Sequence, residues 1–237
     1  YGTVSTSELI FAPSKDGNQL RYTAQLADGN SISQTYTLKE DSYHLDYTLQ
    51  LNGVSQLIDR RDANLRLRWH NYLDRLELNT NFEKYYSTVY YKENNESSDY
   101  CSCRGDDKTE IDNNKIEWFS HANQFFNTSV IAVNKKFENG VFETVMMEDG
   151  DEDLKLVKTE VDIPLDLNNQ ESIQYSLYIG PNEYKNLKVY GNELEQIIPF
   201  GRSIFGTINR HIIRPAFNWL LSFIGSKGIV IIVLIFI

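Results

Sequence analysis

The sequence predicts a mainly β protein, an antiparallel β-sandwich followed by a helical C-terminal segment. Two observations predict the sandwich. Apolar and polar residues alternate along several segments, and turn-forming residues recur about every ten residues. A third observation concerns the end of the chain, where the last nine residues, "IVIIVLIFI", are all apolar. With 237 residues, 15 Tyr and 12 Phe, the chain is long enough to bury a large core.

The clearest alternation is in "SYHLDYTLQLNG", where every second residue from Tyr43 to Leu51 is apolar. The stretch "ANLRLRWHNY" repeats this pattern. A period of two places one face of each strand in a core. We therefore predict that His44 and His70, on the polar side, face solvent. The residues predicted to point inward are Tyr43, Tyr47, Leu65, Leu67 and Trp69.

Other segments extend the β prediction. A hairpin is expected around Asp28-Gly29-Asn30, and further strands in "KIEWFS", "TSVIAV", "VFETVMME", "LKLVKTEVDIPL" and "ESIQYSLYIGP". A short helix is expected around Asn182–Gly191. The polar stretch "KENNESSDYCSCRGDDKTEIDNN" is predicted to be a long surface excursion. Its two cysteines, Cys101 and Cys103, lack the spacing of a redox or zinc motif and are interpreted as incidental thiols.

Catalytic signatures are absent from the sequence. The four histidines have no paired metal spacing, and no nucleophile elbow, P-loop or dinucleotide fingerprint occurs. The run "EDGDED" lacks the ligand spacing of a calcium loop, so we interpret it as a solvated turn. We expect no catalytic centre, no cofactor and no metal. A carbohydrate-active sandwich stays open as an alternative, because paired carboxylates are recognised only in three dimensions.

Charge is distributed unevenly along the chain. All 33 acidic residues lie at or before Glu195, which gives formal charges of −14 for the first 195 residues and +4 for the last 42. An acidic body argues against nucleic acid as a partner. A basic segment beside an apolar run instead predicts contact with a membrane surface. The basic residues expected at lipid headgroups are Arg202, Arg210, Arg214 and Lys227.

Two amphipathic helices are predicted before the apolar end. The first has its apolar residues within roughly 100° of one another. Because proline suits the first turn of a helix, the second is predicted to begin at Pro215 and to end at Gly225, with Gly228 marking a second bend. The residues expected at the membrane interface are Ile204, Phe205, Ile208, Ile212, Phe217, Trp219, Leu220, Phe223 and Ile224. The rival interpretation packs these residues against the sandwich.

The terminal apolar run is too short to span a bilayer. Nine helical residues cover about 14 Å, against about 30 Å for a hydrocarbon core. We interpret the run as the start of a transmembrane helix. The beginning "YGTVSTSELIFAP" reads like the middle of a longer protein, so the chain is expected to be a fragment at both ends.

Three stretches carry a resemblance to a known family. They are "YSLYIGPNEYKNL", "KIEWFSHANQFFNTSVIA" and the C-terminal "PFGRSIFGTINRHIIRPAFNWLLSFIGSKGIVIIVLIFI", with a weaker match in "RLRWHNYLDRLELNTNFEKYYSTVYYK". Together they resemble the YidC branch of the YidC/Oxa/Alb membrane protein insertases, in the form found in the Bacteroidetes. In this resemblance Pro215 matches a proline that opens an interfacial helix, and Gly228 matches the glycine at the start of the second span.

The resemblance implies a periplasmic β-supersandwich, similar to galactose mutarotase, in a protein of the bacterial inner membrane. It implies a non-enzymatic insertase that assists nascent membrane proteins, alone or with the Sec translocon. The expected domains are a sandwich over residues 1–199, an interfacial segment over 200–227 and the start of a span over 228–237. The alternatives are a carbohydrate-active or carbohydrate-binding sandwich with a membrane anchor, and a binding protein with a single C-terminal anchor.

Overall fold

The structure of the protein is a computed structural model that describes residues 5–61, 63–102, 104–167, 170–198 and 208–236. Contacts within the chain divide it into two compact units, Tyr1–Ile197 and Ile198–Ile237. The first unit is an antiparallel β-sandwich and the second is helical, so the predicted fold class is confirmed.

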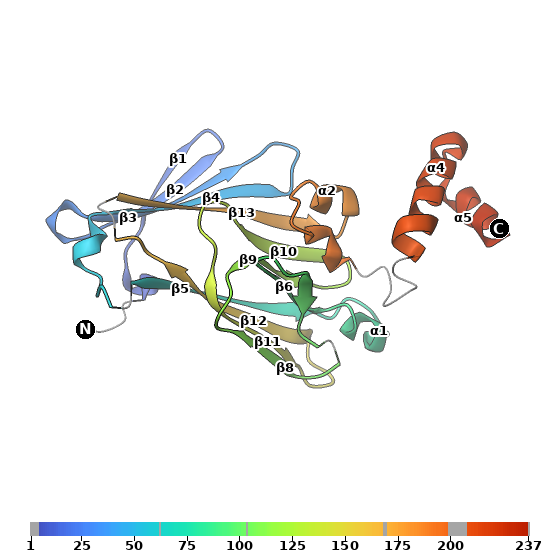
Figure 1. Ribbon diagram of the computed structural model, residues 1–237, viewed down its shortest axis with the longest axis horizontal. Helices are drawn as coiled ribbons and strands as arrows, with labels where there is room; N and C mark the ends of the chain where they lie inside the picture. The colour runs from blue at the N-terminus through green and yellow to red at the C-terminus, as the bar shows by residue number, and fades with distance from the viewer. Residues whose placement is uncertain (1–4, 62, 103, 168–169, 199–207, 237) are drawn as a thin grey trace. The chain divides into compact units, whose positions relative to one another are not determined.

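Two antiparallel sheets form the sandwich, and Figure 1 shows them as two layers. The larger sheet has, in spatial order, β1 (Ala12–Asp16), β2 (Gln19–Gln25), β3 (Ser31–Leu38), β4 (His44–Asn52), β13 (Gln170–Pro181), β10 (Phe126–Ala132), β9 (Ile116–Ala122), β6 (Thr88–Glu93) and β7 (Ser98–Tyr100). The smaller sheet has β5 (Asn64–Asp74), β12 (Asp153–Pro164), β11 (Glu138–Met146) and β8 (Asp107–Ile111). The short helices of this unit are η1 (Thr6–Glu8), η2 (Ala27–Gly29), η3 (Val54–Gln56), α1 (Thr80–Lys84), α2 (Tyr184–Lys188) and η4 (Leu194–Ile197).

The core lies between the two sheets, where the alternating residues of facing strands meet. Register places Tyr47 opposite Tyr175 in the larger sheet and Leu65 opposite Ile163 in the smaller one. Opposed residues of an antiparallel pair share a face, so these pairs contribute to one layer of side chains. Four of the residues predicted to point inward pack against the buried cluster: Tyr47, Leu65, Leu67 and Trp69.

The inward prediction is wrong for Tyr43, which is 52% exposed. The strand begins one residue later, at His44. The Tyr43 ring lies against Gly180, where an added Cβ would come within 2.5 Å of it, and its centroid is 6.1 Å from that of Tyr178. Tyr178 points away from the sandwich interior, so Tyr43 lies on the outer face of the larger sheet.

Two other sequence predictions about exposed residues need correction. The His44 side chain is only 14% exposed because the segment after β13 covers this part of the outer face, whereas His70 is exposed as predicted. The predicted surface excursion contains β7 and β8, and Cys101 within it is fully buried. Cys103 lies outside the described residues.

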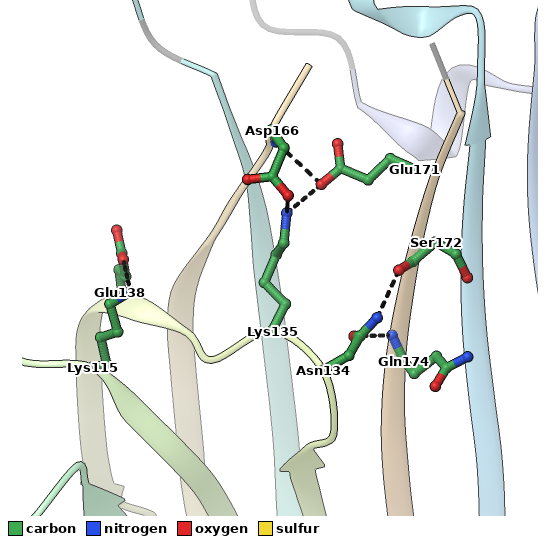
Figure 2. A network of polar contacts seen from close by, with 8 residues as sticks. All are labelled: Lys115, Asn134, Lys135, Glu138, Asp166, Glu171, Ser172 and Gln174. Carbon is green, nitrogen blue, oxygen red and sulfur yellow. Dashed lines mark hydrogen bonds and ion pairs between the residues drawn. The ribbon is translucent and has the colours of Figure 1, made fainter. Parts of the chain in front are cut away.

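A polar network fastens the connection between β10 and β11 to the start of β13 (Figure 2). The Lys135 ammonium contacts Glu171 and lies 2.9 Å from Asp166. Asn134 donates to the Ser172 carbonyl and accepts from the Gln174 amide, both at 2.8 Å. Burial alone would lower the pKa of Lys135, but the bonds to the two carboxylates raise it. The ammonium therefore stays charged and holds the connection in place.

Fixing this connection positions an aromatic side chain of the core. Phe137 follows the network directly, is fully buried, and stacks on Tyr175 with ring centroids 4.8 Å apart. Its backbone pairs with Ile116 as an isolated bridge. A residue outside the regular strands thus fills the centre of the sandwich because the polar network orients its chain.

One histidine is buried between the sheets. His121 of β9 is 1% exposed, and its Nε2 lies 2.8 Å from the Thr159 hydroxyl of β12. Burial, with a smaller contribution from His70, lowers the pKa of His121 to about 3. The imidazole is therefore neutral at physiological pH, and protonating it would place an uncompensated charge in the core.

This burial predicts an acid sensitivity. In the unfolded chain a histidine has a pKa near 6.5. Between pH 6.5 and about pH 3 the unfolded state therefore binds a proton at His121 that the folded state does not bind. Stability should therefore fall as the pH drops from 6.5 towards 3. Between pH 7 and pH 5 the wild type should lose about 2 kcal/mol more than His121→Gln, which keeps a hydrogen-bonding side chain without titrating. Urea unfolding at both pH values measures this difference, and equal losses in the two proteins would contradict the assignment.

Candidate membrane interface

The helical unit contains three consecutive elements in its described part. They are the π-helical turn η5 (Asn209–Ile213), the helix α4 (Arg214–Ile224) and the helix α5 (Lys227–Ile235). Helices α4 and α5 contact one another, and Val230 of α5 is fully buried. Of the predicted interface residues, Ile204 and Phe205 lie outside the described residues, as does Arg202.

The helix does not break at Pro215, contrary to the sequence prediction of two separate helices. Pro215 does lie in the first turn of α4, but the backbone is already helical at Ile208 (φ −60°, ψ −48°) and stays so at Ile213 and Arg214. Through the π-turn the Arg214 amide bonds to the Asn209 carbonyl, five residues back. A wider turn accommodates the proline ring and its missing donor, so the chain continues as one helix.

The end of α4 is the predicted one. Gly225 adopts a left-handed conformation with φ of 68°, and its amide donates to the Leu221 carbonyl at 2.9 Å. Glycine adopts this conformation without the steric penalty of a Cβ. The second bend predicted at Gly228 is wrong, because α5 already begins at Lys227. The change of direction is confined to Gly225 and Ser226.

Helix α4 is apolar around most of its circumference. Trp219 and Phe223, one turn apart, are 63% and 73% exposed and form an edge-to-face pair with centroids 5.2 Å apart. Asn218 and Ser222 lie beside them as a narrow polar strip. The remaining predicted apolar residues of this helix are half-buried: Phe217, Leu220 and Ile224. Trp219 and Phe223 thus form an exposed aromatic ridge.

Further apolar side chains extend this exposed surface before and after α4. Ile208 and Ile212 are 37% and 60% exposed, as is Ile213 at 43%, which the sequence prediction omitted. The exposed apolar residues of α5 are Ile229, Ile231, Ile232 and Ile235, and Phe236, which follows the helix, is exposed as well. Many large apolar side chains exposed within one short unit favour a contact with lipid or with another protein.

The basic residues flank this apolar surface in the sequence. Arg214 is half-buried at the start of α4, and Lys227 is exposed at the start of α5. The Arg210 side chain lies outside the described part of the structure. No helix within the described residues is both long and apolar enough to cross a bilayer.

The segment that leads out of the sandwich is anchored on the outer face of the larger sheet. Tyr190, which follows α2, places its hydroxyl 2.7 Å from His44 Nδ1, and the two rings stack with centroids 5.4 Å apart. The other ring nitrogen of His44 lies 2.5 Å from Asp46 Oδ1. If His44 Nε2–H donates to Asp46, then Nδ1 accepts from the tyrosine, and all three groups are satisfied.

The same segment is buried along its apolar side. Leu187, Leu194 and Ile197 are each at most 1% exposed. The pKa of Tyr190 is raised to about 12, mainly by burial and to a smaller extent by the nearby Tyr178 and Asp46. The Tyr190 hydroxyl therefore remains a donor. Sequence reasoning expected a short helix here but missed the anchoring, because no local pattern links Tyr190 to a histidine 146 residues away.

Comparison with known proteins decides what family this architecture represents. Residues 3–214 match the family described as the YidC periplasmic domain. The chain belongs to the YidC periplasmic domain family.

Relatives of this YidC domain are bacterial proteins named membrane protein insertase YidC. The chain is 30% identical to that of Parabacteroides distasonis over 98% of its length, and 29% identical to that of Azobacteroides pseudotrichonymphae over 93%. It is 25% identical over 98% to a relative from Porphyromonas gingivalis. The aligned part covers 38%, 35% and 38% of these relatives, so the chain spans little more than a third of their length.

The anchored exit of the YidC domain makes a prediction about stability. Tyr190→Phe keeps the ring but removes the hydroxyl that bonds to His44. Loss of one such bond should lower the free energy of unfolding by about 1 kcal/mol. For a protein of this size the melting temperature should fall by about 2–4 °C. Tyr72→Phe, which alters an exposed tyrosine of β5, is the matched control. Equal melting of all three proteins would show that the bond contributes nothing.

Proposed function

We propose that the chain is the periplasmic portion of a membrane protein insertase, which assists the insertion and folding of inner-membrane proteins. Membership of the YidC periplasmic domain family supports this proposal, as do the relatives named membrane protein insertase YidC. The proposed partners are the lipid bilayer and nascent membrane proteins, with the Sec translocon as a further partner of the complete protein.

The observation that carries the proposal is the exposed apolar surface of the helical unit beside basic residues. We assign residues 1–199 to the periplasmic sandwich, 200–227 to an interfacial segment and 228–237 to the start of a transmembrane helix. Fully burying a large apolar side chain contributes about 1.5–3 kcal/mol. Several such side chains, among them Trp219 and Phe223, favour seating in the interface. The acidic body, at −14, is repelled by anionic lipid.

The proposed function requires no catalysis. The groups that metal binding would require do not cluster in the described part of the chain. In this proposal the sandwich is a scaffold that holds and orients the segment that enters the membrane. We therefore propose that the insertase acts by binding and positioning its client.

Vesicle flotation tests membrane seating. The chain should float with vesicles of phosphatidylethanolamine and phosphatidylglycerol, and the same chain lacking residues 202–237 should stay at the bottom of the gradient. Equal flotation of the two proteins would count against the interfacial assignment. A folded but non-floating deletion variant, verified by far-ultraviolet circular dichroism, separates loss of binding from loss of the fold.

The basic residues should contribute a salt-dependent part of this binding. Each contributes about 1 kcal/mol at an anionic surface. Changing Arg202, Arg210, Arg214 and Lys227 to Gln should therefore weaken binding to anionic vesicles strongly and to zwitterionic vesicles little. Titration with vesicles at low and high salt measures the difference. An unchanged affinity for anionic vesicles would remove these residues from the headgroup assignment.

In the complete protein, the aromatic residues of α4 should matter for activity. Changing Phe217, Trp219 and Phe223 to Asp places charges on the apolar surface and should abolish complementation of a depletion strain. Changing Asn218 and Ser222 to Asp places charges on the polar strip of the same helix and should be tolerated. Similar growth with both sets of changes would contradict the assigned orientation.

A further inference from the structure

The turn between α2 and η4 has an unusual backbone. Gly191, Asn192 and Glu193 are three consecutive residues with positive φ, at 66°, 50° and 61°. Glycine adopts this region freely and asparagine tolerates it, but a glutamate there is disfavoured. Such conformations persist only where the surrounding structure holds them in place.

Three contacts from the larger sheet hold this turn. The Trp118 indole of β9 donates to the Asn192 carbonyl at 2.7 Å. The Ser98 amide of β7 donates to Glu193 Oε2 at 3.0 Å, and the Lys92 ammonium of β6 lies 4.0 Å from the same oxygen. The sheet thus helps to fix the strained turn through contacts that lie outside the turn's own backbone bonds.

Helix η4 follows this turn, and its residues contribute both favourably and unfavourably to the free energy of docking on the sheet. Leu194 and Ile197 of η4 are 0% and 1% exposed, which favours the docked state. Against this, Glu195 Oε2 is buried and accepts no hydrogen bond from the described residues. A buried carboxylate oxygen without a donor is unfavourable, and contact with water would satisfy it. Release of the segment therefore relieves both the backbone strain and this unsatisfied oxygen.

We propose that residues 191–197 form a releasable strap, which opens as one unit while the sandwich stays folded. Opening detaches η4 from the outer face of the larger sheet, and Tyr190, held by His44, becomes the new point where the chain leaves the sandwich. The seven released residues add up to about 25 Å of reach to the connection with the helical unit. The use of this reach rests on the proposed function, since it lets the sandwich move away from a membrane-seated helix to admit a client.

Hydrogen exchange followed by mass spectrometry tests the strap without any membrane. The Leu194 and Gln196 amides bond to carbonyls of the turn, at 3.2 Å and 2.9 Å. They should exchange at least about 100-fold faster than the amides of β13, because local opening requires less free energy than global unfolding. Exchange of both sets at the same rate would show that the segment opens only with the whole sandwich and would overturn the proposal.

A pair of substitutions isolates the backbone strain. Asn192→Ala should accelerate exchange at 194–197 about fivefold, whereas Asn192→Gly should not, because only glycine accepts positive φ freely. Both variants keep the carbonyl that Trp118 binds. Asp28→Ala, at the turn between β2 and β3 with φ of 60°, is the control and should leave these amides unchanged. An Ala variant that exchanges no faster than the Gly variant would contradict a strained turn.

A third substitution tests the holding contact. Trp118→Phe removes the donor to the Asn192 carbonyl and should accelerate strap exchange about fivefold relative to β13. Acceleration of both regions by the same factor would mean a general loss of stability and would count against a strap. If this variant fails to fold, the Asn192 pair still decides the question. Because exchange is measured without lipid, a failed flotation experiment leaves this result interpretable.

Discussion

Stacked and tilted aromatic rings run across the inner face of the larger sheet, and the two layers of the sandwich are held together through them. Neighbouring centroids are 4.5 to 6.5 Å apart along this row, within the range where aromatic pairs attract beyond their buried area. Phe142 brings the smaller sheet into the row. The rings, in order, are Tyr36, Tyr47, Tyr175, Phe137, Phe119, Phe142 and Tyr91. The position of Phe137 depends in turn on Lys135 and its two carboxylates, so a polar network at the edge of the core determines how the core is filled.

The outer face of the larger sheet binds the segment that leaves the sandwich. There Trp118, Tyr178 and His44 receive the segment that leaves the sandwich, and this segment is therefore held by side chains from several strands. The sandwich carries the acidic charge of the protein, and the residues after Glu195 carry only basic charge. An acidic sandwich and a helical segment that we propose to seat in the membrane are thus combined in one chain, joined through a segment whose attachment to the sheet we propose to be reversible.

Much of the sandwich could be predicted from the sequence, because alternation along β4 and β5 is a local property of the chain. Gly225 was likewise predictable as the end of α4, since glycine favours the conformation required there. The sequence predictions were wrong where residues far away in the chain, or adjustments of the backbone, determine the burial or the conformation of a residue. His44 is covered by a segment more than 130 residues away, Cys101 is buried although its neighbours are polar, and a π-turn lets the helix continue through Pro215. The strap residues gave no sequence signal, since their conformation depends on contacts with β6, β7 and β9.

Quenching of tryptophan fluorescence by brominated lipids tests the central claim, which is that the helical unit enters the membrane while the sandwich does not. The three tryptophans report on separate places, because Trp69 and Trp118 belong to the sandwich and Trp219 to α4. With brominated vesicles, the wild-type protein should lose the part of its fluorescence that comes from Trp219, whereas Trp219→Phe should keep its fluorescence. Equal fractional quenching of the wild type and of Trp219→Phe would contradict the account.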